Sequence, residues 1–316
     1  MDNFSTSLQL FQLKTIQYSA YLVFLKHYSL LIIPLSITMV VFPNCKINLG
    51  LQILGKRTDG FHDIETVFYP VQFCDALEVI TNKQNDSAFE FTGTGLMVDG
   101  NADNNLCSKA YHLLKKDFQQ LPAVKIHLHK AIPMGAGLGG GSADAAFMLK
   151  LLNDKFNLNF STTQLLNYSL QLGSDCPFFI INKPCFATGR GEMLKEVAVD
   201  LSMYRIVLIN PGIHVDTGWA FSKRSNGPKP SGHLNKSIKE IIKQPIETWK
   251  EEMQNDFETH VFTTHPQIKE IKSALYHQGA LYAAMSGSGS TVFGIFNKQI
   301  NTTLFKDNNY FIKIIN

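Results

Sequence analysis

The 316-residue sequence has no run of basic residues, no paired-cysteine motif and little net charge. Its lysines and arginines are spread along the chain at a net charge of +3, so nothing favours a nucleic acid as a partner. Its five cysteines form no CxxC pair and have no metal-like spacing with histidine. This cysteine usage predicts a reducing, cytoplasmic compartment and no disulfide framework.

The sequence also lacks a clean apolar segment of membrane-spanning length. Residues 16–38 are apolar, but Lys26 and Pro34 interrupt them, whereas a membrane span needs about 20 apolar residues with few charges. A signal peptide is disfavoured because a basic start is missing. A strand-like segment begins at Met39. We therefore interpret residues 1–38 as an extension outside the fold, read from a start codon placed too far upstream, with a weak membrane anchor as the alternative.

Glycine, by contrast, is concentrated in one place. The stretch KAIPMGAGLGGGSADAAFMLK, residues 130–150, has five glycines within the seven positions 135–141 and then becomes helical in pattern. Without a Cβ, glycine lets backbone N–H groups turn inward, and the next helix adds unpaired N–H groups and the positive end of its dipole. A flexible linker is the weaker interpretation, because regular structure flanks the loop on both sides. The loop predicts phosphate binding.

Three common phosphate loops fit this segment poorly. A Walker loop ends in Gly-Lys-Ser/Thr, whereas this loop ends in GSA without a lysine. Gly135, Gly137 and Gly140 match the dinucleotide pattern G-x-G-x-x-G, but that fold needs a second parallel strand where this sequence predicts another helix. The signature motifs of protein kinases are missing.

Four segments resemble a known family. PMGAGLGGGSADAA (residues 133–146) resembles the second motif of the GHMP superfamily of small-molecule kinases, and MSGSGSTVFGIF (residues 285–296) resembles the third. PNCKINLGLQILGKRTDGFHDIETVF (residues 43–68) and LGSDCPFF (residues 172–179) resemble motifs of one branch of it. The resemblance spans about Val40 to the C-terminus. It implies that ATP phosphorylates the 2-hydroxyl of a cytidine diphosphate-linked methylerythritol, a step of the non-mevalonate isoprenoid precursor pathway.

The resemblance also implies residue roles. Asp175 would be the general base for the attacking hydroxyl, with Lys46 supporting it. From the residues alone, Asp175 is either a turn former or a catalytic group held at a strand edge, and a lysine in a strand such as that of Lys46 usually reaches solvent. Asn48, on the same strand face as Lys46, is expected to bind substrate or to hold the lysine. Mg²⁺ is expected to accompany ATP, and the sequence identifies no protein ligand for it. The residues expected to bind ATP are those of the glycine loop: Pro133, Met134, Gly135, Ala136, Gly137, Leu138, Gly139, Gly140, Gly141, Ser142 and Ala143.

The turn at residues 59–60 is the expected cytosine site. In the resembling kinases, the positions of Phe61 and His62 hold the base, the aromatic ring by stacking and the histidine by hydrogen bonds. A tyrosine often stands where this chain has Phe61, so a hydroxyl contact is lost here. Phe221 or Trp219 is the expected second stacking residue.

The fold implied is α+β in two domains. Residues 39–200 would form an ATP-binding and catalytic domain like that of ribosomal protein S5, and residues 201–316 a ferredoxin-like α/β sandwich, with the site in the cleft between them. Residues 210–235 are rich in Gly, Pro and Ser and predict a loop near the boundary. Alternating apolar residues predict a strand over residues 124–130, and a capping box predicts a helix over residues 161–173.

Two other functions stay open. Another GHMP kinase, acting on mevalonate, homoserine or a sugar, would keep the glycine loop but would not need Phe61 and His62. A dinucleotide-binding oxidoreductase would use the same loop for a pyrophosphate and is less favoured. Asp144, in the first turn after the loop, is either a helix residue or a neighbour of the metal. The oligomeric state is unknown.

Overall fold

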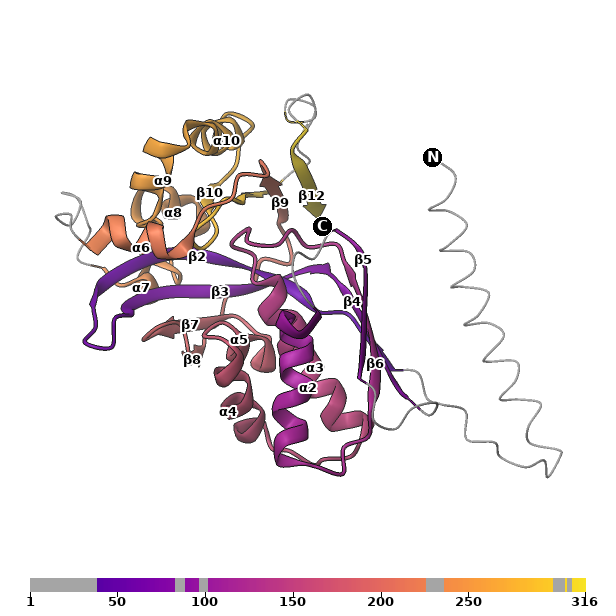
Figure 1. Cartoon of the computed structure of the whole chain (residues 1–316). Helices are drawn as coiled ribbons and strands as arrows, with labels where there is room; N and C mark the ends of the chain where they lie inside the picture. Colours follow the sequence, from indigo (N-terminus) through magenta and orange to yellow (C-terminus); the bar gives the residue numbers. More distant parts are fainter. Residues whose placement is uncertain (1–38, 83–88, 97–101, 226–235, 298–304, 306–308) are drawn as a thin grey trace. The chain divides into compact units, whose positions relative to one another are not determined.

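The computed structural model describes residues 39–82, 89–96, 102–225, 236–297, 305 and 309–316. These residues form one compact unit (Figure 1). The prediction for residues 1–38 lies outside the described part of the chain, and the division into domains at residue 200 stays a prediction. Among the described residues, no helix is both long and apolar enough to cross a lipid bilayer.

The described strands form three four-stranded sheets, which together with the helices confirm the α+β class. All neighbouring strands are antiparallel except β5 and β6, which are parallel. The first sheet has the order β1(Met39–Val41), β4(Ala76–Thr81), β6(Val124–Lys130), β5(Glu90–Gly95). The second has the order β2(Asn44–Lys56), β3(His62–Cys74), β7(Cys185–Thr188), β8(Met193–Glu196). The third has the order β10(Tyr282–Met285), β11(Val292–Phe296), β9(Arg205–Asn210), β12(Phe311–Ile315).

The helices between residues 102 and 181 pack beside the first two sheets (Figure 1). They are η1(Ala102–Asn104), α2(Leu106–Asp117), α3(Gly140–Lys155), α4(Thr162–Leu172) and α5(Cys176–Ile181). The predicted start of α4 is confirmed, because Ser161 and Gln164 form the reciprocal capping box. The chain enters α4 directly after α3, so the second parallel strand of a dinucleotide-binding fold does not follow the glycine loop.

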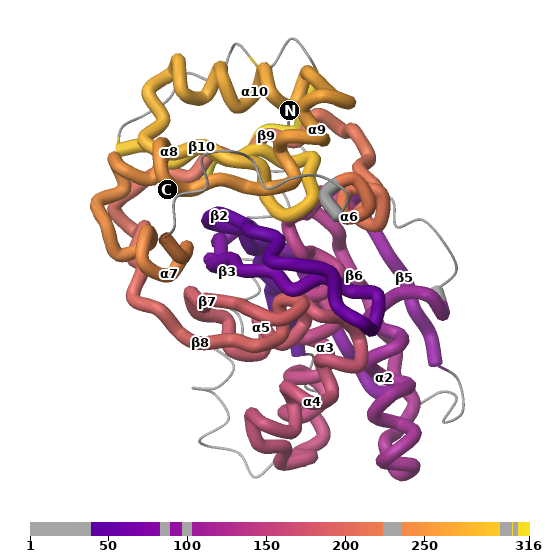
Figure 2. Tube along the Cα trace, turned by 90° about the vertical axis from the view of Figure 1, so that its left-hand side faces the viewer, coloured from indigo at the N-terminus to yellow at the C-terminus, as the bar shows by residue number. Residues whose placement is uncertain are grey.

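The hairpin of β2 and β3 links the two halves of the molecule. Ile47 and Leu49 of β2 are fully buried in a core that also contains Tyr282 and Phe293 of the third sheet. Figure 2 shows β9 and β10 lying next to this hairpin. A bulge at Gly50 (φ +67°) breaks the register with β3 and lets the backbone of β2 pair with the segment before α9. A strand that is buried on both faces in this way can carry side chains into the centre of the molecule.

The C-terminal half corrects one prediction. Part of the segment predicted as a loop, residues 210–235, is helical, and its residues 226–235 lie outside the described part. The helix begins because the Asp216 carboxylate accepts a hydrogen bond of 2.6 Å from the Trp219 amide. The helices here are α6(Thr217–Ser225), α7(Ile238–Ile241), η2(Ile246–Thr248), α8(Trp249–Glu252), α9(Glu258–Thr264) and α10(Pro266–His277).

Candidate active site

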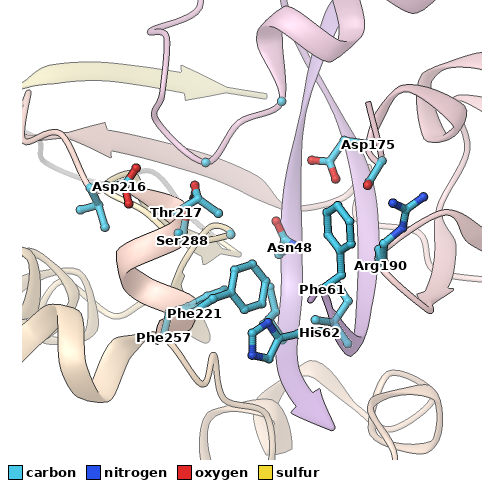
Figure 3. A pocket seen from close by; sticks show the side chains of 18 of the residues that line it. Asn48, Phe61, His62, Asp175, Arg190, Asp216, Thr217, Phe221, Phe257 and Ser288 are labelled. Carbon is cyan, nitrogen blue, oxygen red and sulfur yellow. Dashed lines mark hydrogen bonds between the residues drawn. The ribbon is translucent and has the colours of Figure 1, made fainter. Parts of the chain in front are cut away.

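A pocket of about 850 Å³ lies where these elements meet (Figure 3). Its walls come from the glycine loop, the β2–β3 hairpin, the residues before α5, the β7–β8 turn, α6 and the β10–β11 turn. The residues that line it and are discussed below are Lys46, Asn48, Lys56, Phe61, His62, Gly135, Gly137, Gly139, Asp175, Arg190, Asp216, Thr217, Phe221, Gly287 and Ser288. Most of the residues singled out in the sequence are therefore brought together in one cavity.

Lys46 and Asp175, 129 residues apart in sequence, are neighbours in the pocket. Their Nζ and Oδ2 atoms are 3.5 Å apart, and the lysine side chain is only 4% exposed. Lys46 Nζ also donates to Asn48 Oδ1 at 2.5 Å and to the Gly137 carbonyl at 3.1 Å. Burial lowers the pKa of Lys46, while the charge of Asp175 acts in the opposite direction. The ammonium is thus a nearly dry cation held at one fixed point between the glycine loop and the carboxylate.

Asp175 occupies this place because a short helix begins directly after it. The sequence left it as a turn former or a group at a strand edge, but residues 176–181 form α5, with Pro177 in its first turn, where a missing N–H costs nothing. Asp175 stands at the N-cap position, yet its side chain makes no capping hydrogen bond. The carboxylate, about one-third exposed, faces the pocket instead (Figure 3).

Asn48 connects this pair to the rest of the site. Besides accepting from Lys46, its amide donates to Thr66 Oγ1 at 3.0 Å. Its backbone N–H donates to Ser286 Oγ at 3.3 Å. Of the two roles expected for Asn48, the one visible in the structure is that it orients Lys46.

The glycine loop offers a row of free backbone donors. None of the hydrogen bonds between described residues is donated by the amides of residues 135–142. Gly135, Gly137 and Gly139 have φ values of +60°, +77° and +70°, a region that residues with a Cβ rarely adopt. A Cβ on Gly137 would lie 1.9 Å from the carbonyl oxygen of Ser286. The loop is therefore pressed against the C-terminal half with its amides unpaired, as an anion cradle requires.

Asp144 belongs to a buried ion cluster beneath this loop. Its Oδ2 atom lies 2.7 Å from Lys130 Nζ, which also pairs with Asp75. Asp144 is 3% exposed, and its Oδ1 atom is buried with no hydrogen-bond partner. Burial, reinforced by the Asp75 charge and opposed by Lys130, raises the pKa of Asp144 to about 7. Asp144 is thus a structural residue of the helix rather than a lining residue of the pocket.

The other end of the pocket is lined by the rings of Phe61, His62 and Phe221. The rings of His62 and Phe221 stack with centroids 4.7 Å apart and an interplanar angle of 14°. Phe61 is 51% exposed at the tip of the hairpin. Burial, together with the charge of Lys56, lowers the pKa of His62. Of the two candidates for a second stacking residue, Phe221 lines the pocket, whereas Trp219 packs edge-on toward His265.

A metal held by protein groups alone would need several converging ligands. Among the described residues, no group of three or more His, Cys, Asp or Glu side chains could hold a metal ion. The acidic residues that line the pocket are Asp175 and Asp216. This donor set fits a magnesium ion that arrives with the phosphates of a nucleotide, since Mg²⁺ in such sites usually has few protein ligands.

The lining residues that sequence reasoning missed include Arg190, Asp216 and Thr217. Arg190 follows Gly189 in the β7–β8 turn, and its guanidinium lies 4.6 Å from the centroid of the Phe61 ring. The glycines on either side of Arg190 indicated a turn, but nothing in the sequence indicated which ring that turn would meet.

Comparison with known proteins shows which family the chain resembles. Residues 105–183 match the family described as "GHMP kinases N terminal domain", and residues 237–302 match "GHMP kinases C terminal". The chain is 52% identical over 261 residues to 4-diphosphocytidyl-2-C-methyl-D-erythritol kinase of Bacteroides thetaiotaomicron, covering 83% of this chain and 93% of that protein.

Solved structures agree. A crystal structure of 4-(cytidine 5'-diphospho)-2C-methyl-D-erythritol kinase matches with a TM-score of 0.66 and 30% identity, covering 81% of this chain and 90% of that one. The mevalonate kinase of Methanococcus jannaschii matches with a TM-score of 0.66 and 12% identity, over 89% and 98% of the two chains, which shows a shared fold alone. The chain therefore belongs to the GHMP kinases and, within them, to the 4-diphosphocytidyl-2-C-methyl-D-erythritol kinases.

Proposed function

We propose that this chain transfers the γ-phosphoryl group of ATP to the 2-hydroxyl of 4-diphosphocytidyl-2-C-methyl-D-erythritol, a step in the synthesis of isoprenoid precursors. The observation that carries the proposal is the placement of one carboxylate and one buried ammonium, 3.5 Å apart, between a loop of unpaired amides and a group of aromatic rings. The two ends of this pocket suit a triphosphate and a nucleobase, and the pair between them suits a reacting hydroxyl.

Phosphoryl transfer leaves little covalent work to the protein, so positioning and charge compensation dominate. Asp175 accepts the proton of the attacking hydroxyl, because it is the carboxylate next to Lys46 and is open to the pocket. The ammonium of Lys46 lies next to this carboxylate and offers positive charge to the transferring phosphoryl group. Asn48 and the Gly137 carbonyl hold the ammonium in that position.

The glycine loop binds the phosphates of ATP through main-chain N–H groups. Mg²⁺ that enters with ATP supplies further neutralisation of the phosphate charge. The helix α3 begins at the end of the loop, so its first amides and its dipole point at the same anion. Because these donors are fixed before the reaction, they need no reorganisation when charge moves during transfer.

The cytosine binds at the opposite end. As the His62 and Phe221 rings are in stacking contact, they leave no room for a base between them, and the base stacks on the exposed ring of Phe61. Stacking accepts any base, so hydrogen bonds from the backbone or ring of His62 supply the selection of cytosine. Mevalonate and homoserine have no base, and a pocket built for them would not need this end.

The test is phosphate transfer from ATP to the cytidyl substrate, with mevalonate as the alternative acceptor. Wild-type protein is expected to use the cytidyl substrate only. Asp175→Asn is expected to lower kcat by about 10²- to 10⁴-fold, the usual contribution of a general base, with a smaller effect on KM. An Asp175→Asn variant with full activity would remove this carboxylate from the mechanism, and turnover of mevalonate in place of the cytidyl substrate would refute the proposed acceptor.

A further inference from the structure

Arg190 lines the pocket and, like Lys56, is a cationic side chain that the mechanism does not use. Its guanidinium lies over the Phe61 ring, 4.6 Å from the centroid, and covers one face of that ring. A cation in this position stabilises the ring and leaves the other face for a base. Figure 3 shows Phe61 and Arg190 together, with Asp175 on the same side of the pocket.

The β7–β8 turn fixes the direction of this side chain. The Arg190 amide donates to Glu192 Oε2 at 2.5 Å, and Arg190 Nε lies 3.5 Å from Glu192 Oε1. The Gly189 carbonyl accepts from the Ile64 amide at 2.7 Å, which ties the turn to β3. A Cβ on Gly191 would lie 3.7 Å from Asp175 Oδ1. The β7–β8 turn therefore lies close to the catalytic carboxylate at Gly191, and its Arg190 lies over the ring of Phe61.

Most of the donors of Arg190 remain available. A guanidinium has five N–H groups in a planar fork that suits phosphate oxygens. Nε is the guanidinium nitrogen nearest to Glu192, and the two terminal nitrogens donate no hydrogen bond to any described residue. The arginine side chain is 28% exposed and lines the pocket. Its free donors face the space that a ligand would occupy.

The order in which the groups of the substrate are bonded indicates which group lies in the part of the pocket that Arg190 faces. The diphosphate stands between the cytidine and the methylerythritol, so with the base on Phe61 and the hydroxyl at Asp175 it must cross the region between these two residues. Lys46 already has three oxygen partners. Lys56 lies opposite His62 in the register of β2 and β3, at the base end of the pocket. We propose that Arg190 binds the diphosphate of the substrate while its guanidinium supports the aromatic ring on which the base stacks, an inference that rests on the proposed function.

The experiment compares two probes, cytidine and cytidine diphosphate, by isothermal titration calorimetry. Both probes report on the ring, but only the second carries the diphosphate. Arg190→Gln is expected to weaken cytidine by no more than about fivefold, the scale of an exposed cation–π contact. The loss for cytidine diphosphate is expected to exceed the loss for cytidine by about tenfold, because charge-assisted hydrogen bonds are removed.

Two further variants sharpen this comparison. Arg190→Lys keeps the positive charge but loses the planar arrangement of N–H donors. Its affinity for cytidine diphosphate is expected to lie between those of the wild type and Arg190→Gln. Lys183→Gln removes a cation that pairs with Glu196 at 3.1 Å, is 63% exposed and does not line the pocket. It is the control for long-range charge and is expected to change neither affinity. Circular dichroism and thermal melting verify that each variant is folded.

Equal losses for the two probes would refute diphosphate binding, and unchanged affinities for both would also refute the support of Phe61. These results are separable from the proposed function. If wild-type protein phosphorylates the cytidyl substrate but Arg190→Gln binds both probes normally, only the inference about Arg190 fails. If wild-type protein does not phosphorylate that substrate, the proposed function fails whatever the calorimetry shows.

Discussion

The buried cluster of Lys130, Asp75 and Asp144 makes folding stability depend on pH in a defined direction. Burial, the Asp75 charge and the unpartnered Oδ1 atom favour a protonated Asp144, whose pKa rises from 3.8 to about 7. An acid whose pKa is raised in the folded state binds its proton more tightly there than in the unfolded chain. Its favourable contribution is complete below about pH 4 and is lost as the pH rises through about 7.

The magnitude follows from the same values. A pKa raised from 3.8 to about 7 corresponds to about 4 kcal/mol between the two limits. Between pH 5 and pH 8, the ionisation of Asp144 alone is expected to lower the free energy of unfolding by about 2 to 3 kcal/mol. Asp144→Asn cannot ionise and still leaves Lys130 paired with Asp75, so this part of the pH dependence should disappear.

The assay is urea unfolding of the wild type, Asp144→Asn and Asp154→Asn at pH 5 and pH 8. Asp154 is an exposed carboxylate on the same helix, α3, and serves as the matched control. The difference in stability between Asp144→Asn and the wild type should shift in favour of the variant by about 2 to 3 kcal/mol from pH 5 to pH 8. A constant difference across this range would show that Asp144 is ionised at both pH values and would refute the reasoning.

Two further predictions concern the site. Lys46→Met is expected to lower kcat by about 10²- to 10³-fold, because one preorganised electrostatic partner is removed. The affinity for cytidine, measured by calorimetry, is expected to stay unchanged. Weaker binding of cytidine would mean that Lys46 acts at the base end of the pocket and would contradict its proposed role. Gly137→Ala is expected to destabilise the protein by at least about 2 kcal/mol in urea unfolding, because φ is +77° and its Cβ would meet the Ser286 carbonyl. Gly141→Ala, whose Cβ would have 3.7 Å to its nearest neighbour, is the control and should change stability little; equal effects of the two substitutions would contradict the close contact.

Local structure was largely predictable from the sequence. Apolar and polar residues alternate over residues 124–130, as in a half-buried strand, and the capping box of Ser161 and Gln164 indicates the start of α4. Segments whose helical character depends on one capping contact were not predictable. The start of α6 rests on Asp216, and the surrounding glycines and prolines concealed it.

The site could be predicted in proportion to how much of it lies in continuous motifs. The glycine loop indicated phosphate binding from its own residues. The proximity of Lys46 and Asp175, which joins β2 to the residue before α5, came through the resemblance alone. Arg190 has no motif of its own, since its role depends on where the β7–β8 turn meets Phe61. The sequence left the role of Asp144 open because its partners come from other parts of the chain, Asp75 from between β3 and β4 and Lys130 from the end of β6.

The loop of residues 135–142 meets its ligand with main-chain atoms, and this limits how the protein could escape an inhibitor. Amide donors are the same whatever side chain stands beside them, so a compound that binds only to them offers no side chain whose replacement would remove the contact. Changing Gly137 itself would force the backbone away from Ser286. An inhibitor that also reaches the aromatic end of the pocket, where side chains form the walls, would meet residues whose replacement can weaken its binding.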